Sequence, residues 1–161
     1  GVTPLAAGSD ANAVLRAAAL ASDEATQDPL DLAVLTPARA QALLKDAPQR
    51  QAFHPFDPAT RRSEGVYTVD AQLWRAVKGA ANVIGPLCKL DATQQSMLDA
   101  AEKTLAARGA RVLAVAAGPA DALQLLGVIG LSDPPRPDAA NLIQQLTQLG
   151  VRVHMATGDA L

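Results

Sequence analysis

The chain of 161 residues has little of several things that common protein classes require. Its single cysteine, Cys88, excludes an intrachain disulfide and a zinc site built from cysteines. The longest apolar stretches, such as residues 123–131, are far shorter than the roughly 20 residues that a membrane helix needs. There is no run of Lys and Arg, and the formal net charge is −2, so we expect no nucleic-acid or anionic-membrane partner.

Familiar catalytic and phosphate-binding motifs are also missing. Neither G-x-G-x-x-G nor G-x-x-x-x-G-K-[ST] occurs, so any phosphate pocket has to be built from side chains. No G-x-S-x-G is present and Cys88 has no nearby histidine, which disfavours acyl transfer. His54 and His154 lie far apart without a third ligand at helical spacing, and we therefore expect no protein metal site.

The residues that are present predict a packed domain rather than a disordered one. Hydrophobic residues make up 49% of the chain and aromatics 2%, so aliphatic and alanine side chains must build the core. The pattern predicts a helix over about 11–21, two short helices beginning at Pro29 and Pro37, and a loop or edge strand over 48–62. A hairpin follows, with strands 65–69 and 72–78 and a turn near Asp70 and Ala71.

The second half of the chain is also predicted to contain both helices and strands. We expect a helix over 93–107 that ends at Gly109, buried strands over 111–117 and 125–131, a helix up to Leu149, and a strand over 151–156. Three prolines within residues 133–137 predict a stiff connection between two units. The predicted fold class is α/β (α+β), with a mainly antiparallel sheet flanked by helices over 1–131 and a partial second domain over 132–161.

One cluster of residues could bind a ligand. Phe56 offers an apolar plate for a purine ring, and Arg61 and Lys78 offer the positive charge that phosphates require. Gly79 would allow close approach to the backbone. Each has a structural alternative, with Phe56 in the core and the cations solvated or snorkelling. Similarly, Asp31 could serve only the helix dipole, and Arg111 could be a solvated strand end.

The order of short motifs along the chain is more specific than any of them alone. From about residue 10 to the end, the sequence resembles the cytoplasmic part of P-type cation-transporting ATPases. The matching segments are Gln27–Ala33, Phe53–Arg62 as F-x-P-F-[DN] with a downstream basic residue, Lys78-Gly79-Ala80 as K-G-A, Arg108–Ala116 as R-G-x-R-x-L-x-x-A, Asp133-Pro134-Pro135-Arg136 as D-P-P-R, and Thr157-Gly158-Asp159 as T-G-D. Ala81 departs from the family, in which proline is common at that place.

The resemblance implies a role for each matching residue. Phe56 would stack on adenine, Asp31 would lie near the adenine or ribose edge, and Lys78 with Gly79 would line the nucleotide pocket. Arg61 stands where many members carry lysine, and with Arg111 it would reach the phosphates. The remaining matches belong to the hinge and the phosphorylation domain: Asp133, Pro134, Pro135, Arg136, Thr157, Gly158 and Asp159.

The resemblance also implies a larger protein with an N domain, bound ATP and Mg²⁺, and phosphorylation, actuator and transmembrane domains in the same polypeptide. Its cytoplasmic domain would belong to an integral plasma- or inner-membrane protein. Neither D-K-T-G-T nor G-D-G-x-x-N-D occurs here, so we expect the chain to bind nucleotide without turning it over. The stretches at 18–22, 27–31 and 53–58 look most like those of proton-pumping members, with Mg²⁺, Ca²⁺ or another cation as the alternative transported ion.

Two other classes of function are possible. A soluble phosphatase of the haloacid-dehalogenase (HAD) type would need a nucleophilic aspartate in a D-x-D or D-x-T setting, which Asp121 and Asp133 do not provide. A non-catalytic interaction domain would leave Phe56 and Lys78 as surface and core. ATP binding by the chain separates these hypotheses.

Overall fold

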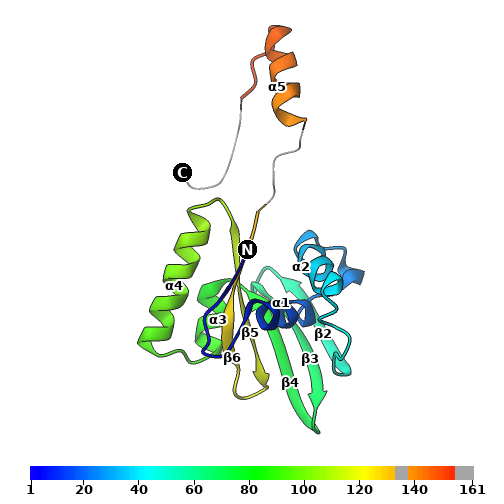
Figure 1. The fold of residues 1–161 in the computed structure, drawn as a ribbon, viewed down its shortest axis with the longest axis vertical. Coiled ribbons are helices and arrows are strands. Elements are labelled where there is room, and N and C mark those ends of the chain that lie inside the picture. The colour runs from blue at the N-terminus through cyan, green and yellow to red at the C-terminus, as the bar shows by residue number, and fades with distance from the viewer. Residues whose placement is uncertain (133–137, 155–161) are drawn as a thin grey trace.

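The computed structural model describes residues 1–132 and 138–154 and is built on one antiparallel sheet (Figure 1). Its six strands have the order β1-β6-β5-β4-β3-β2. They are β1 (Val2–Pro4), β2 (Arg50–Asp57), β3 (Arg62–Val69), β4 (Gln72–Gly79), β5 (Arg111–Pro119) and β6 (Gln124–Leu131). The helices are α1 (Ala11–Leu20), the 3₁₀ turn η1 (Glu24–Thr26), α2 (Pro29–Ala40), α3 (Ala81–Leu87), α4 (Ala92–Ala106) and α5 (Ala139–Gln148).

Helices cover both faces of the sheet (Figure 1). On β5, Val115 and Ala117 pack with α1 and α2, while the alternate residues Ala114 and Ala116 pack with α3 and α4. Because successive strand residues point to opposite faces, a strand that is covered on both sides must be apolar throughout. This explains the uninterrupted apolar run of β5.

The predicted hairpin is confirmed. β3 pairs with β4 from Arg62↔Gly79 to Val69↔Gln72. Both turn residues, Asp70 and Ala71, have positive φ angles of 48° and 62°, as a two-residue hairpin turn of the primed kind requires. Of the two alternatives for 48–62, a loop or an edge strand, the structure has the edge strand β2 over Arg50–Asp57. Its ladder is irregular between His54 and Asp57, where Pro55 lies.

Two predictions are wrong. The pair of short helices at Pro29 and Pro37 is one helix, α2, with Pro37 inside it. The helix continues because Val34 and Leu35 before the proline and Ala38 after it are all buried, and this burial outweighs one lost backbone hydrogen bond. Residues 151–154 form no strand, since no neighbouring strand within the described residues pairs with them.

The sequence analysis missed three elements: β1, the 3₁₀ turn η1 and the short helix α3. The helices expected over 93–107 and up to Leu149 are confirmed as α4 and α5, and α4 is followed by Gly109 with a φ of 72°. The connection at 133–137 and the motif at 157–159 lie outside the described residues. Residue 132, where the predicted second unit begins, follows directly on β6.

A polar pair lies on the sheet among these apolar layers. The guanidinium of Arg75 on β4 donates two hydrogen bonds to the carboxylate of Glu64 on β3, from Nε at 2.6 Å and from Nη2 at 2.8 Å. Burial alone would raise the pKa of Glu64, but hydrogen bonding and the charge of Arg75 outweigh it and lower that pKa. The ionised carboxylate is therefore the form that the fold stabilises.

We predict that this pair makes stability depend on acid pH. Since the folded-state pKa of Glu64 is lowered from its usual 4.5, its contribution is present above that pH and is lost as pH falls through the folded-state value. Glu64→Gln should give a shallower decline of the free energy of unfolding below pH 5, measured by urea denaturation at a series of pH values. Asp121→Asn, at an exposed turn, is the control. An unchanged slope in Glu64→Gln would contradict the prediction.

Candidate functional site

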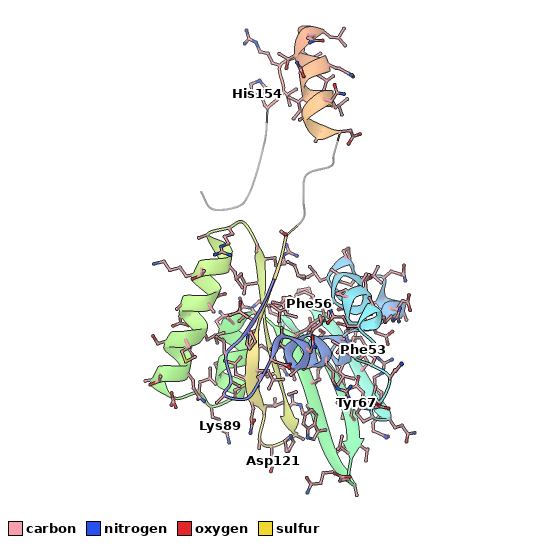
Figure 2. The ribbon with its side chains drawn as sticks, viewed as in Figure 1. Phe53, Phe56, Tyr67, Lys89, Asp121 and His154 are labelled. Atoms are coloured by element: carbon pink, nitrogen blue, oxygen red, sulfur yellow. The ribbon has the colours of Figure 1, made fainter. Side chains whose placement is uncertain are left out.

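Most residues expected to bind a ligand lie at one edge of the sheet, by which we mean the side where β2 and β4 end and β3 and β5 begin. The register pairs Asp57 with Arg62, Arg62 with Gly79, and Gly79 with Ala114, so β2 and β4 end where β3 and β5 begin. The connections thus bring Phe56, Arg61, Lys78 and Gly79 to the edge from which Arg111 starts β5. In Figure 2, Phe56 lies at this end and Asp121 at the opposite end of the sheet.

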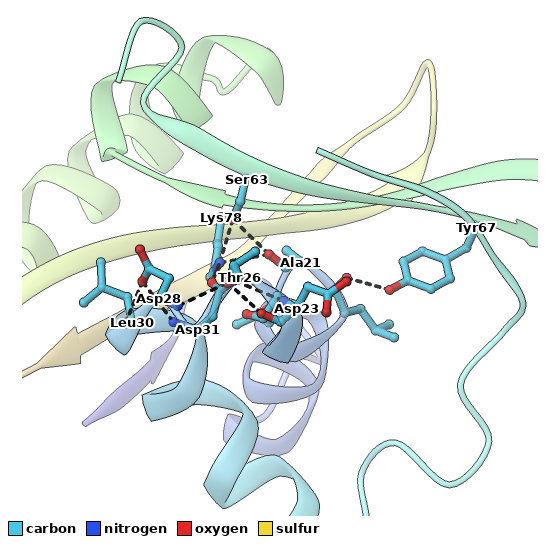
Figure 3. A network of polar contacts seen from close by, with 12 residues as sticks. Ala21, Asp23, Thr26, Asp28, Leu30, Asp31, Ser63, Tyr67 and Lys78 are labelled. Carbon is cyan, nitrogen blue, oxygen red and sulfur yellow. Dashed lines mark hydrogen bonds and ion pairs between the residues drawn. The ribbon is translucent and has the colours of Figure 1, made fainter. Parts of the chain in front are cut away.

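Lys78 lies beneath this edge, with only 4% of its surface exposed. Its ammonium group donates to the carbonyl oxygen of Ala21 at 2.8 Å, to Oδ1 of Asp31 at 2.6 Å and to Oγ of Ser63 at 2.6 Å (Figure 3). A lysine has three N–H donors, and all three have an acceptor here. Desolvation lowers the pKa of Lys78, and the hydrogen bond and charge of Asp31 oppose that shift.

Asp31 is as deeply buried as its partner, and its second oxygen is also used. Oδ2 accepts from the backbone N–H of Asp23 and from the hydroxyl of Thr26, each at 3.1 Å. Asp31 therefore ties η1 and the start of α2 to β4. The N-terminus of α2 is no free anion site, because Pro29 has no N–H and the side chain of Asp28 caps Leu30 and Asp31.

Gly79 allows a close backbone contact within the protein, which the sequence analysis did not predict. A Cβ atom at this position would lie 2.4 Å from the carbonyl oxygen of Arg61 and 2.9 Å from the Cα of Arg62. The close approach is thus made by the protein's own backbone. Arg61 has a φ of 50°, its N–H donates to Asp57, and its carbonyl accepts from Ala80 at 3.2 Å. These contacts fix the backbone from which the exposed Arg61 side chain extends.

Phe56 and Arg111 are both accessible. Phe56 is 51% exposed on the edge strand β2, so the interpretation of it as a core residue is wrong. Arg111 lines an open groove of about 870 Å³, whose opposite wall is the N-terminal turn of α2 with Asp28, Pro29 and Leu30. This volume lies within the range of small-molecule sites. Phe56, Arg61 and Lys78 do not line the groove.

Sequence reasoning missed Ser63 and Thr26 as members of the network. Ser63 could have been found, because it stands directly opposite Lys78 in the β3–β4 register and so shares its face. Thr26 had no comparable signal, since its contact with Asp31 depends on the shape of η1.

The described residues contain no group of three or more His, Cys, Asp or Glu that could hold a metal ion. Among the helices of residues 1–132 and 138–154, none combines the length and apolar character needed to cross a membrane.

The described part of the chain is a mixed α/β domain, in which helices flank a six-stranded antiparallel sheet on both faces. Residues 12–161 match the haloacid dehalogenase-like hydrolase family, and the chain belongs to that family. The chain is also 36% identical over 144 residues to a protein of Methanocaldococcus jannaschii named as a cation-transporting ATPase, covering 88% of this chain and 18% of that protein. Two proteins of Leishmania donovani, named as proton ATPases 1A and 1B, are each 35% identical over 160 residues.

The two Leishmania matches cover 96% of this chain and 16% of each relative. The chain therefore spans less than a fifth of the length of these curated relatives.

The close packing of the Arg61 backbone against Gly79 gives a testable prediction. Gly79→Ala should destabilise the fold by about 1–3 kcal/mol, because its methyl group meets backbone atoms that cannot rotate away. Gly130→Ala is the matched control within a strand: its Cβ would meet the flexible Leu105 side chain at 3.1 Å. Urea denaturation measures both free energies of unfolding. An equal decrease in the free energy of unfolding of both variants would contradict a specific steric requirement for glycine at position 79.

Proposed function

We propose that the chain forms the nucleotide-binding part of a P-type cation-transporting ATPase, joined to part of its phosphorylation domain. The observation that carries the proposal is the gathering of Phe56, Arg61 and Arg111 at one edge of the sheet. These residues are separated by up to 55 positions in sequence, and the strand register brings their backbones to the same edge in the order Phe56, Arg61, Arg111. The similarity to proteins named as ATPases supports the same function.

In this proposal the ligand is ATP, and its two ends meet different side chains. The exposed ring of Phe56 stacks on adenine, as an aromatic plate can do for any base. Arg61 and Arg111 bind the phosphates, for which a guanidinium fork is suited. Asp31, Lys78 and Gly79 lie beneath this surface and form the buried part of the proposed nucleotide site.

The whole protein would couple ATP hydrolysis to cation transport through an aspartyl phosphate. Mg²⁺ would enter as the ATP complex, with ligands mainly outside the residues described. The hinge Asp133–Arg136 and the motif Thr157–Asp159 would connect the chain to the phosphorylation domain, and actuator and transmembrane domains would complete the polypeptide. The chain would then be a cytoplasmic domain of a plasma- or inner-membrane protein.

The transported cation is proposed to be the proton. Two relatives are named as proton ATPases and one as a cation-transporting ATPase, so Mg²⁺, Ca²⁺ or another cation is the alternative. Membership of the haloacid dehalogenase-like family keeps a soluble phosphatase as the second candidate. The similarity to named ATPases across 88–96% of the chain favours the pump.

Nucleotide titration tests the proposal. The chain should show saturable amide shifts near Phe56 and Arg61 when ATP, ADP or AMP is added, followed by NMR. Phe56→Ala should weaken all three nucleotides by about fivefold or more, because base stacking on an aromatic contributes about 1–3 kcal/mol. Arg61→Ala and Arg111→Ala should weaken ATP more than AMP, because they remove charge that faces the phosphates.

Lys89→Asn is the control for loss of a cation, since Lys89 is exposed far from this edge and asparagine tolerates its left-handed backbone (Figure 2). This variant should bind all three nucleotides like the wild type. Absence of saturable shifts at millimolar ATP in the wild-type chain would overturn the proposed function.

A further inference from the structure

The buried ammonium of Lys78 has no donor left for a ligand. Its three acceptors come from three segments: the carbonyl of Ala21 after α1, the hydroxyl of Ser63 on β3, and the carboxylate of Asp31 in α2. The three distances lie between 2.6 and 2.8 Å, as short as charge-assisted hydrogen bonds or slightly shorter. A phosphate could bind Lys78 only by taking one of these bonds from a buried acceptor.

Losing one of these bonds would be costly. Asp31 is 4% exposed and Ser63 is 2% exposed, so water cannot replace the lysine as their partner. A buried carboxylate without its cation carries the full desolvation penalty. In contrast, Arg61 and Arg111 are exposed and form no ion pair within the described residues. They can meet an anion without breaking an internal contact.

The network also reaches the wall of the groove. Through Oδ2, Asp31 holds the N–H of Asp23 and the hydroxyl of Thr26, and so fixes the turn that leads into α2. The N-cap residue Asp28 and the first residues of α2, Pro29 and Leu30, form the groove wall that faces Arg111. Figure 3 shows Lys78, Asp31, Thr26 and Asp23 joined in one network of polar contacts.

We infer that Lys78 is a positioning residue, which holds the N-terminal wall of α2 through Asp31 and does not itself contact the nucleotide phosphates. The inference rests on the proposed nucleotide site and assigns Lys78 a different task from the one that the resemblance to P-type ATPases implies. It makes Asp31 and Ser63 partners in the same task.

Comparison of ligands with different numbers of phosphates tests this role. Lys78→Met keeps an unbranched side chain of similar length and removes the charge. A positioning residue should weaken adenosine, AMP and ATP by the same factor, equal within about twofold, as expected for contributions that add independently. A phosphate contact would instead make the loss for ATP at least tenfold larger than the loss for adenosine, and that result would overturn the inference.

A second variant guards against misfolding of Lys78→Met. Ser63→Ala removes the hydroxyl that accepts from Lys78 and donates to the carbonyl of Ala21, and it leaves the ion pair of Lys78 with Asp31 in place, so the fold is expected to survive. Since it loosens the network, it should weaken adenosine and ATP equally and increase the amide hydrogen exchange of Asp23, whose N–H is held by Asp31. Unchanged exchange at Asp23 or selective loss of ATP binding would contradict the positioning role.

The two proposals fail in different ways. If the wild-type chain binds none of these ligands, the proposed function is overturned. If the wild type binds ATP and the loss in Lys78→Met increases with the number of phosphates, the proposed function stands and only the positioning role is overturned.

Discussion

The buried ion pair between Lys78 and Asp31 is the constraint on which the arrangement of this domain depends. Two charges that are each 4% exposed are costly to remove from water, and they are tolerated only when every donor and acceptor is satisfied. Here that condition requires the end of α1, the strand β3 and the start of α2 to meet at one point. Displacement of any one of them would leave a buried charge without a full set of partners.

A second constraint, at the residue after Lys78, is steric. The backbone of Arg61 packs where a side chain on Gly79 would lie, and the carbonyl of Arg61 accepts a hydrogen bond from the N–H of Ala80, the residue that follows Gly79. Lysine and glycine are neighbours in the sequence, but they act on different segments, the lysine on α2 and the glycine on the β2–β3 connection. The charges of Lys78 and Asp31 are therefore buried, whereas Arg61 and Arg111 are exposed and form no ion pair within the described residues.

The sequence predicted most of the fold, because alternation on strands and glycine or proline at turns are local signals. The hairpin around Asp70 and the helix before Gly109 are examples. Pro37 misled the prediction because the burial of α2 is a tertiary effect. For the same reason the sequence selected Asp31 and Lys78 as candidate site residues without indicating that they bind each other. That contact joins positions 47 residues apart, one on strand β4 and the other in helix α2.

The spacing of the exposed groups limits the kind of ligand that can use them together. Phe56 belongs to β2 and Arg111 to β5, and three strand spacings, roughly 14 Å, separate those strands. A compact anion could reach only one of them. An elongated molecule with an aromatic ring at one end and negative charge at the other matches the order Phe56, Arg61, Arg111 along the edge. A nucleoside triphosphate has this polarity. In the proposed function its phosphates point toward the groove beside Arg111, whose α2 wall the Lys78–Asp31 pair is proposed to hold in position.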